Sequence, residues 1–191
     1  MFFYRSTPPL NPIIVGDSGL ILRAPLSSDY LAWKEIRLAS QEFLTPWEPL
    51  WPTNDLTRLG YRRRLKRYER ELYNRTGATY FLVSAKDNLP MGGITISNIR
   101  QGVARCCNIG YWMGEAHSGQ GHMGKAVAEI CRHIFAELQL CRIEAACLPE
   151  NTRSARLLIS AGFEREGLLR QYLEINGQRH DHVLFSLLNE N

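Results

Sequence analysis

The chain has 191 residues and a formal net charge of +4, with 45% hydrophobic and 22% charged residues. Because about 100 to 200 residues make one domain, we expect a single domain over residues 1–191, and this composition excludes disordered, collagenous and disulfide-rich scaffold proteins. No apolar run approaches the ~18 to 20 residues that a membrane span needs, and the first residues lack the pattern of a signal peptide. We therefore expect a cytoplasmic globular protein without membrane contact.

The five cysteines, Cys106, Cys107, Cys131, Cys141 and Cys147, are odd in number and form no C-x-x-C pair. Disulfide frameworks and structural zinc sites depend on such pairs. We expect free, buried thiols instead.

The N-terminal half begins with an extension over residues 1–18 and a strand at Leu20–Arg23. The run Ser27–Asp29 is typical of a helix N-terminus and predicts a helix to about Ser40. Residues Phe43–Pro52 hold three prolines and two tryptophans. This composition excludes regular structure there and favours an ordered aromatic loop.

A basic, amphipathic helix is predicted over residues 54–73, where apolar residues recur at helical spacing. Between Arg58 and Arg70 lie seven basic residues and one acid, Glu69, a local charge of +6 that leaves −2 for the rest of the chain. The excess of positive charge is therefore confined to one helix. This face is either solvated or contacts the phosphates of a ribosome or another RNA.

The C-terminal half predicts a regular alternation of elements, which ends in two closing strands. The expected strands are 80–84, 91–96, 107–113, 142–147, 163–175 and 180–187, and the expected helices are 121–138 and 152–161, the second ended by Gly162. The first three strands are expected to pair as an antiparallel meander. The whole order predicts one mixed α/β domain.

A glycine-rich loop, Gly119–Lys125, lies between a predicted strand and a predicted helix. Backbone N–H groups and the helix dipole make such a position an anion site, so we expect phosphate binding here. The loop matches G-x-G-x-x-G, and Glu144 follows Gly124 by 20 residues, but only 67 residues remain after Gly124, too few for a dinucleotide-binding domain. It also matches G-x-x-x-x-G-K, but Ala126 stands where a nucleotide-hydrolysing loop needs a hydroxyl for Mg²⁺.

The segments after this loop resemble a known family. Together with the loop, the long helix and the next strand, Pro149–Leu158 and Ala161–Gly167 resemble the GNAT superfamily of acetyl-CoA-dependent N-acetyltransferases over nearly the whole chain. Within it, Phe43–Pro49, Arg142–Ala145 and Gly177–Leu184 are similar to the RimJ and RimL type of ribosomal-protein N-terminal acetyltransferase, most of all to the alanine-specific RimJ type. The resemblance implies a mostly antiparallel sheet of about six or seven strands, flanked by about four helices and splayed at the cofactor strand.

The resemblance also implies where acetyl-CoA is held. The implied contacts are Tyr111, Trp112, Met113, Ser118, Gly119, Gln120, Gly121, His122, Met123, Gly124, Lys125, Asn151 and Ser154. Of these, the backbone N–H groups of Tyr111–Met113 would stabilise the oxyanion, and Asn151, which is also expected to cap the next helix, would reach the pantetheine amides. The segment 43–75 would lie on the substrate side.

Direct attack on a thioester needs a neutral amine, an oxyanion site and a proton donor for the departing thiolate. An α-amine with a pKa of ~7.7 to 8.0 is partly neutral at pH 7, whereas a lysine with a pKa of ~10.4 is not, so a chain without an obvious strong base suits protein N-termini. Glu144 is the candidate base, acting through water with a pKa raised by apolar neighbours; the alternative is an ordinary ion pair. Ser154 or Tyr172 would supply the proton to the thiolate. Ser154 could equally bond the backbone of its own helix. Some related enzymes have a tyrosine acid at the position that Leu158 occupies here.

Trp47 and Trp51, together with Trp112, could form the wall of a slot for an extended peptide end, or they could simply pack under the loop. His180 and His182 alternate on one strand without a visible third ligand, so no metal is expected.

Three functions remain open from the sequence. The leading hypothesis is acetylation of the N-terminal α-amine of a protein, a ribosomal protein that starts with Ala or Ser. The second is acetylation of a small amine such as a polyamine, an amino acid or an antibiotic, because the fold does not determine the substrate. The third is a ribosome- or RNA-associated factor with secondary transferase activity.

Overall fold

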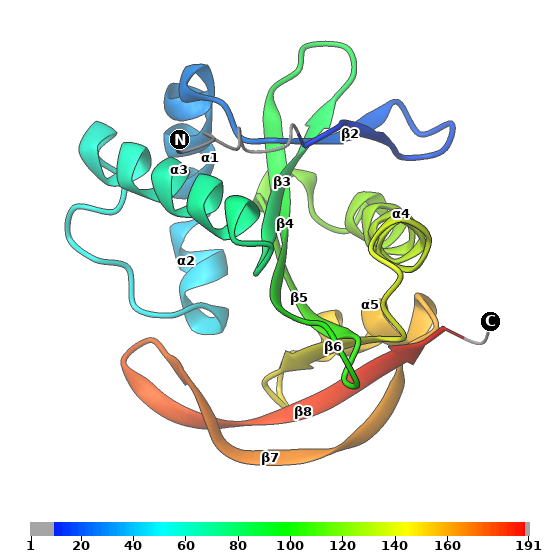
Figure 1. Ribbon diagram of the computed structural model, residues 1–191. Coiled ribbons are helices and arrows are strands. Elements are labelled where there is room, and N and C mark those ends of the chain that lie inside the picture. Colours follow the sequence, from blue (N-terminus) through cyan, green and yellow to red (C-terminus); the bar gives the residue numbers. More distant parts are fainter. Residues whose placement is uncertain (1–9, 190–191) are drawn as a thin grey trace, which may run out of the picture.

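The computed structural model describes residues 10–189, which form one eight-stranded sheet with helices on both faces. The strands are β1 (Ile13–Ile14), β2 (Leu20–Arg23), β3 (Ala78–Ser84), β4 (Pro90–Arg100), β5 (Cys106–Met113), β6 (Arg142–Cys147), β7 (Glu164–Ile175) and β8 (Gln178–Leu188). The helices are α1 (Tyr30–Ala39), α2 (Gln41–Leu44), α3 (Arg58–Tyr73), α4 (His122–Glu137) and α5 (Thr152–Ser160). In Figure 1, α1, α2 and α3 lie on one side of the sheet and α4 and α5 on the other.

The strand order is β1-β2-β3-β4-β5-β6-β8-β7, and all neighbours pair antiparallel except β5 and β6. The expected meander of three strands is confirmed as β3, β4 and β5, and so is the mixed α/β fold class. None of the helices within residues 10–189 is long and apolar enough to cross a membrane.

Three details differ from the sequence-based prediction. The basic helix begins at Arg58 rather than near Asn54, because Thr57 caps it and accepts a hydrogen bond from the backbone N–H of Gly60 at 3.0 Å. The proline-rich segment contains regular structure after all: the short helix α2, which was not expected, ends in it at Leu44, and a 3₁₀ turn follows at Thr45–Trp47, because a proline suits the first turn of a helix. The two-residue edge strand β1 was missed, because so short a strand shows no periodicity; it lies in the expected N-terminal extension, of which residues 1–9 lie outside the described part.

The core has two parts, one on each face of the sheet. The larger part lies under α4 and α5, and the smaller part surrounds Trp33 and Tyr61 on the face of α1 and α3. Successive side chains of a strand point to opposite faces, so Tyr111 of β5 packs against the larger core and Trp112 against the smaller one. Two consecutive residues of β5 therefore lie on opposite faces of the sheet, one against each part of the core.

The sheet splays between β5 and β6. The two strands pair only from Cys106 to Asn108 with Arg142 to Glu144. Beyond this point β5 continues along β4 to Met113, whereas β6 continues along β8 to Cys147. Every second residue of 109–113 therefore directs its N–H and C=O groups to a side without a partner strand. The expected splay at this strand is confirmed.

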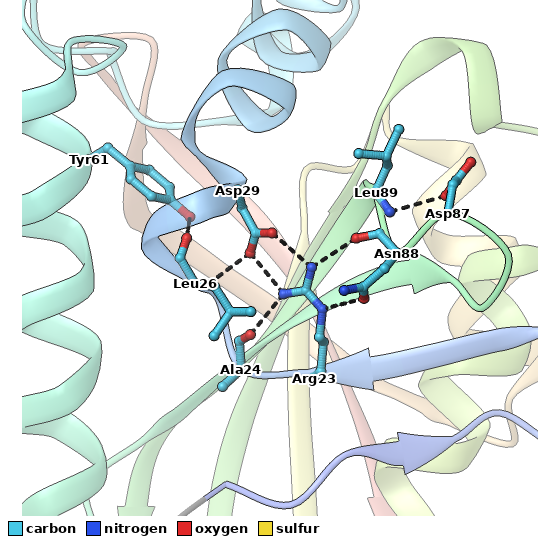
Figure 2. A network of polar contacts seen from close by, with 8 residues as sticks. All are labelled: Arg23, Ala24, Leu26, Asp29, Tyr61, Asp87, Asn88 and Leu89. Atoms are coloured by element: carbon cyan, nitrogen blue, oxygen red, sulfur yellow. Dashed lines mark hydrogen bonds and ion pairs between the residues drawn. The ribbon is translucent and has the colours of Figure 1, made fainter.

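A buried ion pair ties α1 to the sheet, as Figure 2 shows. Arg23 at the end of β2 is 8% exposed and donates to both carboxylate oxygens of Asp29 at 2.8 Å. The same guanidinium donates to the side chain and the backbone of Asn88 in the turn between β3 and β4. Nearby, the Tyr61 hydroxyl of α3 donates to the carbonyl of Leu26 at 2.8 Å. This network fixes the position of the helical face relative to the strands.

All five cysteines are free thiols, as expected, and only Cys141 is more than slightly exposed. Burial raises the pKa of the Cys107 and Cys131 thiols and of the Tyr80 hydroxyl to about 12. The folded protein therefore keeps these groups protonated well into alkaline solution.

We expect stability to fall steeply at high pH. In the unfolded chain the thiols ionise near pH ~8.5 and the phenol near pH ~10, so above these values the unfolded state binds fewer protons than the folded state. The stabilisation is complete below pH ~8.5 and is lost as the pH rises toward about 12, by about 1.4 kcal/mol per pH unit for each ionised group. Thermal unfolding across this range tests it. The Cys131→Ala variant should show a shallower decline than the wild type, and an equal decline would contradict this assignment.

Candidate functional site

The glycine loop joins β5 to α4 through two left-handed residues. Gly119 and Gly121 both have φ of +76°, a conformation that side chains rarely adopt. Gly121 is the residue before the helix, and no side chain caps that helix end. The first turn of α4 therefore presents its backbone N–H groups without a capping side chain.

The surroundings of the loop suit a phosphate group. A Cβ atom added at Gly119, Gly121 or Gly124 would meet nothing within 4 Å, so open space lies beside the backbone there. Lys125 is exposed in the first helical turn, where its charge can reach an anion. The buried Nδ1 of His122 has no partner among the described residues, while its Nε2 contacts Gln120 at 3.0 Å. An uncapped helix N-terminus beside open space is an anion site on physical grounds.

Other loop residues have supporting positions. Gln120 donates to the carbonyl of Ala116, and Ser118 lies 3.4 Å from the guanidinium of Arg153 at the start of α5. Met113 and Met123 are buried in the larger core, so their side chains support the loop rather than face solvent. The loop is thus held on one side by the core and remains open on the other.

The start of α5 faces the splay between β5 and β6. Asn151 is the N-cap, as expected: its Oδ1 accepts from the backbone N–H of Ser154 at 3.0 Å. The Ser154 hydroxyl lies 2.7 Å from the Tyr111 hydroxyl, and so does not depend on its own helix for a partner. Burial raises the pKa of Tyr111 above its ordinary value, which keeps this phenol protonated at neutral pH. Two hydroxyl groups are thus linked at the edge of the splay.

A cluster of charged and aromatic side chains lies on the opposite face of β5. Arg37 of α1 is 5% exposed and donates to both carboxylate oxygens of Glu48, the Nη1 contact being 2.7 Å. Its guanidinium stacks 4.1 Å from the ring centre of Trp51 and 5.0 Å from that of Trp112. The Trp51 indole donates to Glu48 at 2.8 Å. The ion pair therefore holds both indoles against one cation.

Glu48 also connects this cluster to the hairpin of β7 and β8, because its backbone carbonyl accepts from the N–H of Asn176 at 2.9 Å. The helix α1, the segment 45–51, the end of β5 and this hairpin turn therefore meet at one place. We call the cluster of Arg37, Glu48, Trp51 and Trp112 the indole clamp.

A groove of about 540 Å³ lies on the same face of the sheet as α3. It is lined by Glu71 from α3, by the end of β4 including Arg100, by Asn108 and Glu144 from the sheet, and by Tyr172 from β7. The Tyr172 ring packs edge-to-face on His182 at 5.8 Å. The structure thus brings Glu144 and Tyr172 to one groove, whereas Ser154 meets Tyr111 on the side of α4 and α5.

The expected apolar surroundings of Glu144 are wrong. Its carboxylate accepts from Arg142 at 2.8 Å and from Arg100 at 3.3 Å. Arg142 also binds Glu166, whose pKa it lowers to about 2 together with the Ser186 hydroxyl. Glu144 thus has the ion pairs of the alternative interpretation. The alternation of side chains along β6 already places Arg142 on its face, but the sequence did not show that Arg100 of β4 joins them.

Trp47 is 38% exposed at the end of the 3₁₀ turn and is not part of the indole clamp. Within residues 10–189, no group of three or more His, Cys, Asp or Glu side chains could hold a metal ion.

Three polar residues of the site were missed in the sequence. Arg37 and Glu48 form the indole clamp, and Arg153 lies between Ser118 and the ring of Phe43, 4.6 Å from the ring centre. Arg37 could have been found, because it follows Tyr30 and Trp33 at helical spacing on the buried stripe of α1. Nothing in the sequence distinguishes Glu48 or Arg153 from other charged residues in their segments.

Strand β5 splays from its parallel neighbour beside a glycine loop and an uncapped helix N-terminus. This arrangement is typical of proteins that bind a phosphate-bearing cofactor along the sheet. Comparisons with known proteins identify that class. The model of the acetyltransferase (GNAT) domain family matches residues 19–164. The ribosomal protein uS5-alanine N-acetyltransferase of Escherichia coli is 33% identical over 190 residues, which are 98% of this chain and 95% of that protein.

Solved structures agree with this result. The RimJ protein of Mycobacterium smegmatis, in complex with a CoA disulfide, superposes with a TM-score of 0.85 at 34% identity, covering 90% of this chain and 82% of that one. The ribosomal-protein-S5-alanine acetyltransferase of Vibrio fischeri has a TM-score of 0.84 at 29% identity, covering 91% and 95%. The chain belongs to the GNAT acetyltransferase family, and it is an acetyl-CoA-dependent N-acetyltransferase.

Proposed function

We propose that this enzyme transfers the acetyl group of acetyl-CoA to the N-terminal α-amine of a protein, and that the acceptor is a ribosomal protein that starts with Ala or Ser. The observation that carries the proposal is the open groove on the face of α3, opposite the glycine loop. A groove of about 540 Å³ has room for several residues of an extended chain. The relatives named as ribosomal-protein-alanine and ribosomal-protein-serine acetyltransferases support the acceptor class. Such an acceptor would be met in the cytoplasm.

The two substrates would reach the splay from opposite faces of the sheet. Acetyl-CoA would lie along the glycine loop and α5, so that its thioester reaches the unpaired edge of β5 near Tyr111. The acceptor must approach from a side that the first substrate leaves free, which is the side of Trp112 and the indole clamp. Segment 43–75, which supplies Glu48, Trp51 and α3, would therefore form much of the acceptor side, with Trp47 at its exposed rim.

The chemistry would need little more than positioning. An α-amine with a pKa of ~7.7 to 8.0 loses its proton to solvent without a strong base. Among Tyr111, Trp112 and Met113, the backbone N–H groups that alternate toward the unpaired edge of β5 would stabilise the oxyanion. The Ser154 hydroxyl, oriented by the Tyr111 hydroxyl 2.7 Å away, would then give its proton to the departing thiolate and regain one from solvent.

Glu144 and Tyr172 would act from the groove rather than from the side of Ser154. Glu144, paired with Arg100 and Arg142, would order water in the groove and carry the amine proton away through it. Tyr172 would contact the acceptor chain rather than the thiolate. Acetylation of a small polycation is less well supported, since both carboxylates that line the groove are already paired, Glu144 with Arg100 and Arg142 and Glu71 with Arg67.

The indole clamp gives a prediction about the acceptor. Arg37→Lys keeps the charge but cannot form the two parallel hydrogen bonds to Glu48, so Trp51 and Trp112 lose their fixed spacing. We expect KM for an acceptor peptide to rise about tenfold, with KM for acetyl-CoA unchanged, because one charge-assisted hydrogen bond is worth ~1.5 to 3 kcal/mol. Steady-state kinetics measure both values. The matched control is Arg132→Lys, which makes the same change in an exposed ion pair on α4. If Arg37→Lys raised the KM for acetyl-CoA as much as the KM for the peptide, a role on the acceptor side would be contradicted.

A panel of acceptors tests the proposed function. Peptides that start with Ala or Ser, the same peptides with other first residues, and spermidine are each incubated with the enzyme and acetyl-CoA. The release of free CoA thiol is then followed. We expect turnover with the Ala and Ser peptides above the others. Turnover with spermidine alone would move the assignment to small amines.

A further inference from the structure

We propose that the exposed face of α3 binds the phosphate backbone of structured RNA. The face carries six exposed cations: Arg58, Arg62, Arg63, Lys66, Arg67 and Arg70. The ion pairs of the helix use Arg64, with Asp55, and Arg67, with Glu71. In the described part of the chain, the other five exposed cations have no carboxylate partner. A concentrated, unneutralised charge of this kind attracts a polyanion.

Four of the exposed cations form a row of like charges along the helix. Arg58, Arg62, Lys66 and Arg70 follow one another at intervals of four residues, about 6 Å along the axis. Like charges at this spacing repel each other, and a cation in the first turn opposes the helix dipole. Only a negatively charged binding partner would relieve this repulsion and make the row of cations stabilising.

The chemistry of the face favours RNA over a membrane or an acidic protein. The apolar side of α3, with Tyr61, Leu65 and Leu72, is already packed against the sheet, so no apolar side remains to enter a lipid surface. Protein interfaces concentrate apolar anchors near their centre, whereas the large exposed apolar residues of α3, Leu59 and Tyr73, lie at its two ends. Five of the six cations are arginines, whose planar forks match phosphate oxygens.

A shallow hollow beside the helix adds a place for one phosphate group. It has a volume of about 270 Å³ and is lined by Arg63, Arg64 and Arg67, with Asn54, Asp55 and Gly60 on its other side. The arginines outnumber the single carboxylate of Asp55, which is already paired with Arg64. The hollow therefore keeps a net positive charge.

The face also lies next to the proposed acceptor groove, because Glu71 of α3 lines that groove and pairs with Arg67 at 3.6 Å. An RNA bound to α3 would hold its own bound proteins near the groove. RNA binding is nevertheless independent of the proposed acceptor, since it would persist if the acceptor were a small amine.

Binding of a fluorescently labelled RNA hairpin, measured by anisotropy between about 50 mM and about 200 mM salt, tests the proposal. The double variant Arg62→Glu with Lys66→Glu reverses two unpaired cations. Its matched control, Lys86→Glu with Arg156→Glu, makes the same change in net charge at two exposed positions elsewhere. A cooperative thermal unfolding transition shows in parallel that each variant is folded.

We expect the wild type to bind the hairpin with a steep salt dependence. The α3 variant should bind at least tenfold more weakly at low salt, with a smaller salt slope by about one to two, while it still unfolds in one cooperative transition and the control variant binds like the wild type. Three results would overturn the proposal: no hairpin binding by active wild-type enzyme, equal weakening by the two double variants, or displacement of the hairpin by poly-glutamate as effective as by unlabelled RNA. The last result would assign the face to an acidic protein.

Discussion

Ser154→Ala is expected to slow acetyl transfer about 100-fold, through kcat, with little change in KM for acetyl-CoA. The variant removes the hydroxyl that we propose protonates the departing thiolate, and general acid catalysis is worth about 10²- to 10⁴-fold. It leaves the helix intact, because Asn151 caps α5 through the backbone N–H of residue 154 and not through its side chain. Stopped-flow or steady-state measurement of CoA release gives the value.

Two further variants separate this role from packing. Ser160→Ala removes a hydroxyl from the far end of the same helix, where it donates to the carbonyl of Leu157, and should change kcat by less than about twofold. Tyr111→Phe should cause a smaller loss than Ser154→Ala, because it keeps the proton donor and removes only the hydroxyl that orients it. A loss of tenfold or less for Ser154→Ala would assign the proton to water or to another residue.

The largest effect on stability is expected for Arg23→Met. The change leaves the Asp29 carboxylate, 6% exposed, without its partner in the network of Figure 2. Breaking a buried ion pair by removing one member costs about 3 to 5 kcal/mol, because the remaining charge is not solvated. The hydrogen bonds to Asn88 are lost as well. Denaturant unfolding measures the change in free energy, and the melting temperature should fall by about 10 °C or more.

The matched control is Arg132→Ala, which breaks the exposed pair of Arg132 with Glu129 on α4. Exposed pairs contribute about 1 kcal/mol or less, so this variant should unfold almost like the wild type. The double variant Arg23→Met with Asp29→Leu should recover part of the loss, because it leaves no charge buried. If Arg23→Met and Arg132→Ala were equally stable, the buried network would not hold α1 to the sheet.

Most of the fold could be predicted from local patterns, because strands, caps and glycines leave signals within a few residues. Gly162 ends α5 with φ of +90°, and Asn151 begins it, as their residue types indicate. The exceptions are instructive. Strand β1 has only two residues, too few to show a period, and α3 begins at Arg58 rather than near Asn54 because Thr57 caps it.

The glycine loop was predictable from the sequence because its residues are contiguous, and its left-handed glycines and uncapped helix follow from local chemistry. The residues on the proposed acceptor side were not predictable in this way. Glu144 has acidic character in the sequence, but its ion pairs come from Arg100 on β4 and from Arg142 on its own strand, and only the sheet register places all three together. Arg37 and Glu48 likewise meet through tertiary packing of α1 against the segment after it.

The central claim of this account is that the acceptor is an α-amine. Mass spectrometry of two peptides after incubation with enzyme and acetyl-CoA tests it most directly: one starts with a free Ala, and the other has a blocked N-terminus and a lysine. We predict one added acetyl group on the free N-terminus and none on the lysine peptide, because only the α-amine is appreciably neutral at pH 7 without a strong base. Acetylation of the lysine, or of neither peptide by an enzyme that turns over a small amine, would contradict the claim.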